Sequence, residues 1–382
     1  MLALEIIFWI AVGLIVYTLF IYPLLALLLA VIIRKKVDKQ PIEPKVSFII
    51  AAYNEEDVIA EKIQQTLELD YPAEKLEIIV ASDGSTDRTD EIVQSFADRG
   101  VKLSRVEGRL GKTHALNETV NVATGDILIF SDATGMYNRQ AIRELVANFN
   151  DPTVGCVTGR VAYTYGKDTI SVGFRGYQNI AVAIRRAESD FGSQTTVSGS
   201  IHAIRSEIYK PAHPDFSSDA IDAINTVVAG YRVLYENNAV SQEESRTTAR
   251  DEFRCRIRIG IHATTMIPYI LSQLIRHMKF GYLFQMISHK FMRWYLWLFL
   301  LGAFSCNLAL ALQGDSFLYL TLFRLQVAFY ATAIFGLLLS RWGIGIPLLS
   351  TLAFFLLGVS GSCIGSLQCI TGKRMATWEP VR

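Results

Sequence analysis

Polar residues follow three apolar stretches at points where a strand is expected to end. Asn54 and Glu55 follow "VSFIIAAY", Asp83 follows "LEIIVAS", and Asp132 follows "ILIFS". Carboxylate and amide oxygens at such positions can bind a divalent cation or the polar groups of a ligand. Because parallel strands end at one edge of a sheet, these residues predict a single ligand site.

Two further residues could act on a ligand there. Lys112, in "GRLGKTHALN", stands at the expected start of a helix, where its charge could neutralise a phosphate. A nucleotide-triphosphatase loop is disfavoured, because Val106 occupies the position of that motif's first glycine. Asp219 begins another expected helix, with Asp222 on the same side. It could be a helix cap or a catalytic base, and spacing alone leaves both open.

Arginines recur every four residues in "SRTTARDEFRCRIRIG" and would form one cationic face of a helix. They are Arg246, Arg250, Arg254 and Arg258. Guanidinium groups bind diphosphates, and they also bind anionic lipid headgroups. The sequence leaves both interpretations open.

The residues between 46 and 132 alternate between apolar strands and helical segments. Strands are expected at 46–54, 76–84, 101–107 and 126–132, with helices at 55–69, 88–97 and 113–123. Strands joined by helices need crossover connections, so the pattern predicts an α/β fold with a mainly parallel, doubly wound sheet.

Both ends of the chain are strongly apolar. A hydrophobic content of 51% and a mean hydropathy of +0.28 place part of the chain in lipid. Residues 1–33 predict one transmembrane helix, and residues 292–372 predict about three more, at 292–312, 317–339 and 344–370. Four crossings would leave the C-terminus outside, whereas Lys373, Arg374 and Arg382 favour the inside. The sequence leaves this conflict open, and the last segment, rich in Gly and Ser, could be re-entrant.

The remaining boundaries follow from charge and composition. Residues 34–45 are charged and contain two prolines, which predicts a stiff linker to a domain at 46–260. The basic residues 34–36 place this domain in the cytoplasm, on a multi-pass protein of the plasma (inner) membrane. Residues 261–291 predict interfacial helices, and residues 373–382 a tail.

A net charge of +1 gives no case for a nucleic-acid partner, and the five cysteines show no paired spacing typical of zinc sites.

In order along the chain, "VSFIIAAYNEE", "IIVASDGSTDRT", "GKTHALN", "DILIFSDATGMY", "VGCVTGR", "VSGSIHAIR", "SSDAIDAINTVVAGYRV" and "RIRIG" resemble the motifs of inverting family 2 glycosyltransferases. This group includes membrane-bound hyaluronan, chitin and cellulose synthases, and the resemblance covers about residues 46 to 260. It implies a glycosyltransferase-A fold and a nucleotide-sugar donor, most often a UDP-sugar.

The resemblance also implies roles for individual residues. Asp83 matches the aspartate that holds the nucleobase or ribose, and Lys112 lies in a segment that lines the nucleotide. Asp132 matches the first acid of an Asp-x-Asp motif that binds Mg²⁺ or Mn²⁺, and Thr134 replaces the second. The metal would stabilise the UDP leaving group.

Asp219 matches the aspartate of the family's Glu-Asp motif, which is the general base, although Ser218 replaces the glutamate. The processive synthases carry Gln-x-x-Arg-Trp further on, where this chain has "FRCRIRIG". The glutamine and tryptophan are absent, but Arg254 and Arg258 are candidates for binding the donor diphosphate.

Three functions are compatible with these residues. The leading hypothesis is a membrane-embedded hexosyltransferase that moves a sugar from a UDP-sugar to a lipid-linked or growing saccharide acceptor, in polysaccharide or glycolipid synthesis. The second is a processive synthase that also extrudes its product. The third is a weakly catalytic nucleotide-sugar-binding subunit, since Thr134 and Ser218 replace two acids. Membrane lipids, and a partner subunit or a second copy of the chain, are further expected partners.

Overall fold

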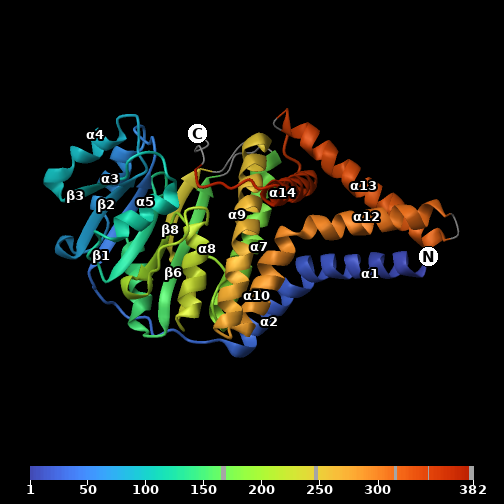
Figure 1. The fold of residues 1–382 in the computed structure, drawn as a ribbon, viewed down its shortest axis with the longest axis horizontal. Helices are drawn as coiled ribbons and strands as arrows, with labels where there is room; N and C mark the ends of the chain where they lie inside the picture. The colour runs from blue at the N-terminus through green and yellow to red at the C-terminus, as the bar shows by residue number, and fades with distance from the viewer. Residues whose placement is uncertain (165–168, 245–247, 314–315, 343, 378–382) are drawn as a thin grey trace.

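A computed structural model describes the chain except for residues 165–168, 245–247, 314–315, 343 and 378–382 (Figure 1). Arg246 and Arg382 therefore lie outside the described residues.

The described residues form one eight-stranded sheet in the order β3-β2-β1-β4-β7-β6-β8-β5. The strands are β1 Val46–Ala52, β2 Leu76–Ser82, β3 Val101–Arg105, β4 Ile127–Asp132, β5 Met136–Tyr137, β6 Val154–Thr164, β7 His202–Arg205 and β8 Arg232–Glu244. The first four strands run parallel, as the alternating pattern predicts. The complete sheet is mixed, because β7 is antiparallel to both β4 and β6, and β5 is antiparallel to β8.

Helices cover both faces of this sheet (Figure 1). They are α3 Ile59–Leu67, α4 Thr89–Gln94, α5 Lys112–Val120, α6 Ala141–Val146, α7 Thr169–Phe191, α8 Ser218–Val228 and α9 Ala249–Arg276. Successive residues of β1 point to opposite faces. Phe48 packs in the core that contains Ile63 of α3, and Ile49 packs in the core that contains Leu116 of α5 and Ile221 of α8.

The long helix α9 belongs to the sheet domain as much as to the membrane region. Met266, Ile270 and Leu274 lie in the same core as Ile49 of β1. The domain boundary expected at residue 260 falls inside this helix, so residues 261–276 pack on the domain.

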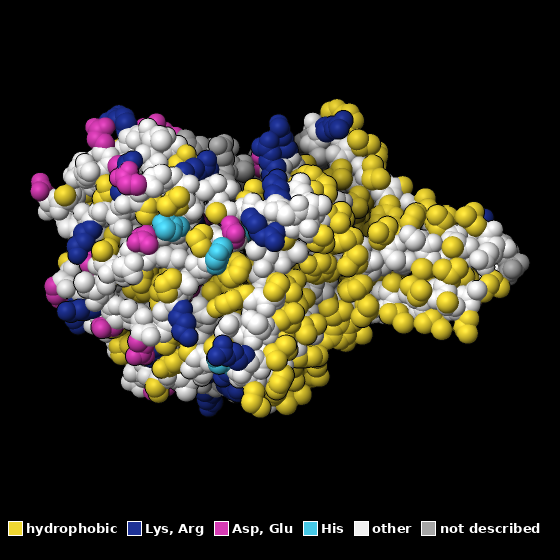
Figure 2. Space-filling view, in the orientation of Figure 1, with side chains coloured by type: hydrophobic (Ala, Val, Ile, Leu, Met, Phe, Trp, Pro, Cys, Tyr) yellow, Lys and Arg dark blue, Asp and Glu magenta, His cyan; other side chains and the backbone are white. Residues whose placement is uncertain are grey.

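The remaining helices carry most of the apolar surface, and several of them extend away from the sheet (Figures 1 and 2). They are α1 Leu2–Val16, α2 Tyr22–Ile33, α10 Phe280–Met286, α11 Met292–Trp294, α12 Leu296–Leu312, α13 Phe317–Ser340 and α14 Pro347–Ile370, with a π-helical turn between α1 and α2. Among the described residues, Leu2–Ile33, α13 and α14 are each long and apolar enough to cross a membrane. The pair Phe280–Trp294 and α12, bent by 59°, could supply a fourth crossing.

The last helix, α14, lies across α7 and α9. Added Cβ atoms at Gly173 of α7 and at Gly365 of α14 would lie 2.5 Å from the Ser350 carbonyl oxygen and 2.2 Å from the Ile257 carbonyl oxygen, respectively. Only glycine permits backbones to approach so closely. Figure 1 shows α14 nearly end-on, whereas α1 and α12 run side by side across the view.

Both ends of α14 lie next to the sheet domain. Its first turns contact α7, and Ala376, six residues beyond its end, lies against Gly111 at the start of α5. We infer that α12 and α13 leave the domain side and return to it, whereas α14 stays there. This path places the basic residues Lys373 and Arg374 on the side of the domain, as their charge favours.

Candidate active site

Lys112 and Asp132 meet at the carboxyl edge of the sheet. Lys112 is the first residue of α5, and its ammonium group forms an ion pair with the Asp132 carboxylate at the end of β4. It also donates to the carbonyl oxygen of Gly199 at 3.3 Å. The Asp132 side chain is 39% exposed and that of Lys112 is 29% exposed, so a ligand can reach both.

Asp219 approaches the same glycine from α8. A Cβ atom on Gly199 would lie 3.2 Å from the Lys112 Nζ and 3.7 Å from the Asp219 Oδ2. Ser217, not Asp219, is the N-cap residue of α8, and its hydroxyl donates to the Asp219 Oδ1. The carboxylate of Asp219 is thus held through one oxygen, while the other faces the space around Gly199.

Asp222, three residues further along α8, lies in a different environment. Its side chain is buried, and its Oδ2 forms a hydrogen bond with the His202 Nε2 at 3.1 Å. Burial raises the pKa of this carboxyl group. Asp222 is therefore part of the core, and only Asp219 of this pair reaches the site.

Asp83 holds the loop that leads into α5. Its carboxylate accepts hydrogen bonds from the backbone amides of Leu110 at 2.8 Å and Gly111 at 2.9 Å. Burial raises its pKa, although these two amides favour the charged form. Arg109, in the same loop, lies 4.2 Å above the ring of Tyr53, which follows β1. Tyr53 and Arg109 are neighbours of the edge that sequence analysis did not single out.

Asn54 and Glu55 connect two loops of the same edge. Asn54 has a positive φ of 53°, and its side-chain oxygen accepts a hydrogen bond from the Thr86 amide at 2.8 Å. The backbone amide of Glu55 donates to the Thr89 Oγ1 at 2.8 Å. These contacts fix the loop after β1 against the loop after β2, and binding of substrate by either side chain stays a prediction.

The helix α9 brings a histidine and an arginine to the site. His262 forms a hydrogen bond through Nδ1 with the Asp215 carbonyl oxygen at 3.0 Å. Its pKa is lowered, mainly by burial and further by the charge of Arg258, while Asp219 acts in the opposite direction. Arg258 is half-buried one turn before His262, and Arg254 is exposed. His262 is not among the residues predicted from the sequence, although its four-residue spacing from Arg258 places it on the same helix face.

Lys62 is fully buried behind the loop that carries Asp132 and Thr134. Its ammonium group donates to the Gly135 carbonyl oxygen and lies 4.2 Å from the ring centre of Tyr137 and 5.2 Å from that of Phe48. Burial lowers its pKa to about 7, whereas Asp132 and Glu243 act to raise it. The sequence pattern of α3 gave no reason to expect this lysine in the core.

We expect Lys62 to make stability depend on pH. Since its pKa is about 7 when folded and 10.5 is the ordinary value, the unfolded chain binds more protons between these values. The free energy of unfolding should therefore rise with pH across this window, and Lys62→Met should lack that rise. Melting temperatures at about pH 6.5 and about pH 9 measure the difference. Lys102→Met, at an exposed lysine, is the control, and parallel curves for the native chain and Lys62→Met would contradict the expectation.

The segment after α14 touches the loop held by Asp83. Gly111 has a φ of 101°, and a Cβ atom there would lie 2.2 Å from the Ala376 carbonyl oxygen. Residues 371–377 thus lie beside the start of α5, whose first residue, Lys112, belongs to the candidate site.

Gly111→Ala should displace this segment. We expect tryptic cleavage after Lys373 and Arg374 to become about fivefold faster, which corresponds to a loss of about 1 kcal/mol of local stability. Gly100→Ala is a matched control, because Gly100 also has a positive φ, of 83°, but an added Cβ would meet nothing within 4 Å. Equal cleavage rates in both variants would show that the contact does not hold the segment.

The residues at the edge fit a metal ion only in part. Among the described residues, no group of three or more His, Cys, Asp or Glu side chains could hold one. Asp132 offers one carboxylate, and Thr134, which is exposed, offers a hydroxyl. Mg²⁺ is commonly held by one or two carboxylates together with substrate phosphates and water. The site therefore fits a metal ion that is bound together with a diphosphate.

The fold and the family follow from comparison with known proteins. The solved mannosyltransferase PcManGT from Pyrobaculum calidifontis, in complex with GDP-Man and Mn²⁺, superposes with a TM-score of 0.68 at 24% identity, over 94% of this chain and 99% of that one. Residues 47–211 match the model of the glycosyl transferase family 2. The chain thus contains a family 2 glycosyltransferase domain with a glycosyltransferase-A fold, as the ordered motifs imply.

Relatives of known name share part of the chain. A probable glycosyltransferase YdaM from Bacillus subtilis is 27% identical over 61% of this chain and 58% of its own length. A poly-beta-1,6-N-acetyl-D-glucosamine synthase from Staphylococcus aureus is 29% identical, over 50% of this chain and 48% of its own. A beta-monoglucosyldiacylglycerol synthase from Synechocystis is 32% identical, over 42% and 33%. The matches thus span between a third and three fifths of these relatives.

Proposed function

We propose that this chain is a membrane-embedded inverting glycosyltransferase that transfers a sugar from a nucleoside-diphosphate sugar to a lipid-linked or growing saccharide acceptor. The observation that carries the proposal is the meeting of Lys112, Asp132 and Asp219 around Gly199. A cation for a diphosphate, a carboxylate for its metal ion and a second carboxylate for a proton are the groups that such a transfer needs.

Each residue then has a separate task. Asp219, held by Ser217 through Oδ1, accepts the proton of the acceptor hydroxyl with Oδ2. The acceptor oxygen, as it loses this proton, attacks the anomeric carbon from the face opposite the diphosphate. The diphosphate leaves with the bonding electron pair, and the configuration at the anomeric carbon is inverted. Lys112 moves from Asp132 to the diphosphate and offsets its charge.

Asp132 and Thr134 would hold Mg²⁺ or Mn²⁺ beside the diphosphate. When bound, the ion would stabilise the negative charge that develops on the leaving group. The proposal extends to a cytoplasmic domain at the plasma membrane, supported by the basic residues that follow the first span.

The donor can be identified by nucleotide release. Purified chain in lipid nanodiscs would be offered UDP-sugars and GDP-mannose with Mg²⁺ or Mn²⁺, and release of UDP or GDP would be measured. The resemblance favours a UDP-sugar, whereas the similar solved structure contains GDP-Man. Release from one donor that requires both metal ion and acceptor supports the proposal. Metal-dependent donor binding with no turnover over a broad acceptor panel would instead favour the binding-subunit hypothesis.

A processive synthase is the second candidate, because one group of relatives is named as synthases of a polymer. Sizing the product by mass spectrometry separates the two. Addition of one sugar to each acceptor excludes processive synthesis under those conditions, and a ladder of long products would favour it.

A further inference from the structure

A groove lies where α13 ends, α9 begins and α14 crosses. Its volume is about 430 Å³, and it is lined by Ala249, Arg250, Phe253, Leu337, Ser340, Arg341, Leu356, Leu357 and Ser360. Because α13 returns to the domain side here, the groove lies at the level expected for lipid headgroups. Trp342, 70% exposed directly after Arg341, is a residue type enriched at that level.

The groove has a cationic part and an apolar part. Arg250 and Arg341 are exposed, and neither guanidinium has a hydrogen-bond or carboxylate partner among the residues that the structure describes. Among the residues that the structure describes, no acidic side chain lines the groove. The nearest acids along α9 are engaged elsewhere, since Asp251 accepts from the Thr248 hydroxyl and Glu252 pairs with Arg256 at 2.6 Å.

The other part of the groove has apolar walls that an acyl chain could contact. Phe253 of α9, Leu337 of α13, and Leu356 and Leu357 of α14 supply them, and α13 and α14 are both apolar helices of spanning length. A phosphate that accepts hydrogen bonds from two guanidiniums, followed by an acyl chain along these walls, would satisfy both parts.

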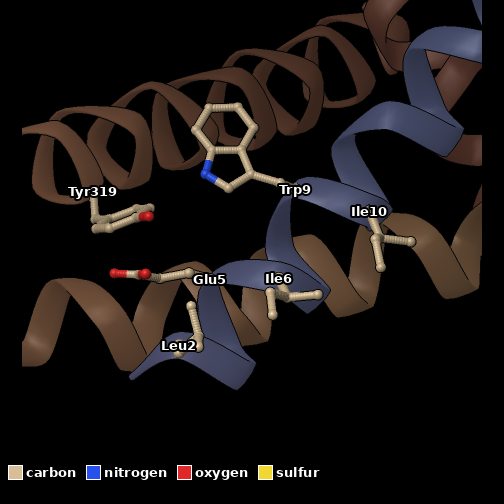
Figure 3. A pocket seen from close by; sticks show the side chains of 6 residues that line it. All are labelled: Leu2, Glu5, Ile6, Trp9, Ile10 and Tyr319. Carbon is tan, nitrogen blue, oxygen red and sulfur yellow. The ribbon is translucent and has the colours of Figure 1, made fainter.

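A groove of similar size elsewhere has the opposite charge. It measures about 500 Å³ and lies at the start of α1, where it is lined by Leu2, Glu5, Ile6, Trp9 and Ile10 of α1 and by Tyr319 of α13 (Figure 3). Of the described residues that line it, Glu5 is the charged one. The two grooves therefore differ in the sign of the headgroup that each would attract.

We propose that the groove between α9, α13 and α14 binds an anionic phospholipid, with the headgroup phosphate on Arg250 and Arg341 and an acyl chain against Phe253 and Leu357. Arg250 precedes Arg258, at the candidate active site, by eight residues, or about 12 Å along α9. A lipid bound here would hold the first turns of α9 at the membrane surface. This proposal does not depend on which sugar the chain transfers.

The test is retention of lipid by the purified full-length chain in native mass spectrometry. The probes are phosphatidylglycerol and phosphatidylcholine, and the variant is Arg250→Gln/Arg341→Gln. Each arginine near the membrane surface contributes about fivefold to anionic lipid binding, so we expect about 25-fold weaker phosphatidylglycerol affinity in the double variant. Each single variant should show about fivefold, and Arg250→Lys/Arg341→Lys should retain most of the affinity.

Arg276→Gln is the matched control, because Arg276 is exposed at the other end of α9. Three results would overturn the proposal. Equal phosphatidylglycerol retention in the native chain and the double glutamine variant would show that the two arginines do not bind the headgroup. Equal retention of phosphatidylcholine would show that charge is not recognised. Displacement by soluble glycerol phosphate at equal concentration would show that the acyl chain contributes nothing.

Discussion

Asp219→Asn should reduce sugar transfer by about 10²- to 10⁴-fold, because an amide cannot accept the proton of the acceptor hydroxyl. Donor binding should change little, since the diphosphate is assigned to Lys112 and Asp132 and not to Asp219. The asparagine can still accept from Ser217 through its side-chain oxygen, so the start of α8 should keep its shape. The measurements are turnover at saturating donor and donor affinity by calorimetry.

Asp222→Asn is the matched control on the same helix. Asp222 is buried against His202 and does not reach Gly199. We expect this change to lower the melting temperature while turnover per folded molecule stays within about threefold of the native value. If Asp219→Asn kept native turnover, Asp219 would lose the role of general base.

Asp132→Asn should have the second largest effect, a loss of about 10²- to 10³-fold in kcat/KM. The change removes the one carboxylate of the candidate metal site and leaves the Lys112 ammonium without its ionic partner. In contrast to Asp219→Asn, it should raise the metal concentration that gives half-maximal rate and weaken metal-dependent donor binding. Initial rates across a titration of Mn²⁺ measure both.

Thr134→Ala distinguishes the two metal-ligand candidates. The hydroxyl of Thr134 is neutral and exposed, so water can replace it and we expect only a severalfold loss. An equal dependence on Mn²⁺ in the native chain and in Asp132→Asn would mean that Asp132 does not hold the ion.

The first half of the sheet could be predicted because each strand carries its own apolar run between helices. The strand β2, for example, has the start that its pattern gives, and Asp83 and Asp132 stand directly after or at the end of their strands. The antiparallel strand β7 has only four residues, and its place beside β4 depends on contacts far along the chain. Local periodicity carries no information about such pairing.

In the candidate site, too, some features could be predicted from the local sequence and others depend on contacts far along the chain. Helical spacing places Asp219 and Asp222 on one side of α8, but only the fold shows that His202 covers one of them. The burial of Lys62 also could not be predicted from the sequence, because a lysine in an amphipathic helix ordinarily faces water. For α14, composition indicated a helix long enough to span the membrane. The role of its glycines, which allow its backbone to approach α9 closely, can be seen only when the partner helix is known.

The path of α14 limits what could pass through the membrane beside this chain. If α14 stays on the domain side, the described helices that cross are α1, α12 and α13. Among the described residues, α12 packs against both α1 and α13, and a ring of three helices at the usual spacing of about 8–10 Å would be too narrow for a sugar ring. If the product is a polysaccharide, a conduit for it through the membrane would need walls beyond these three helices.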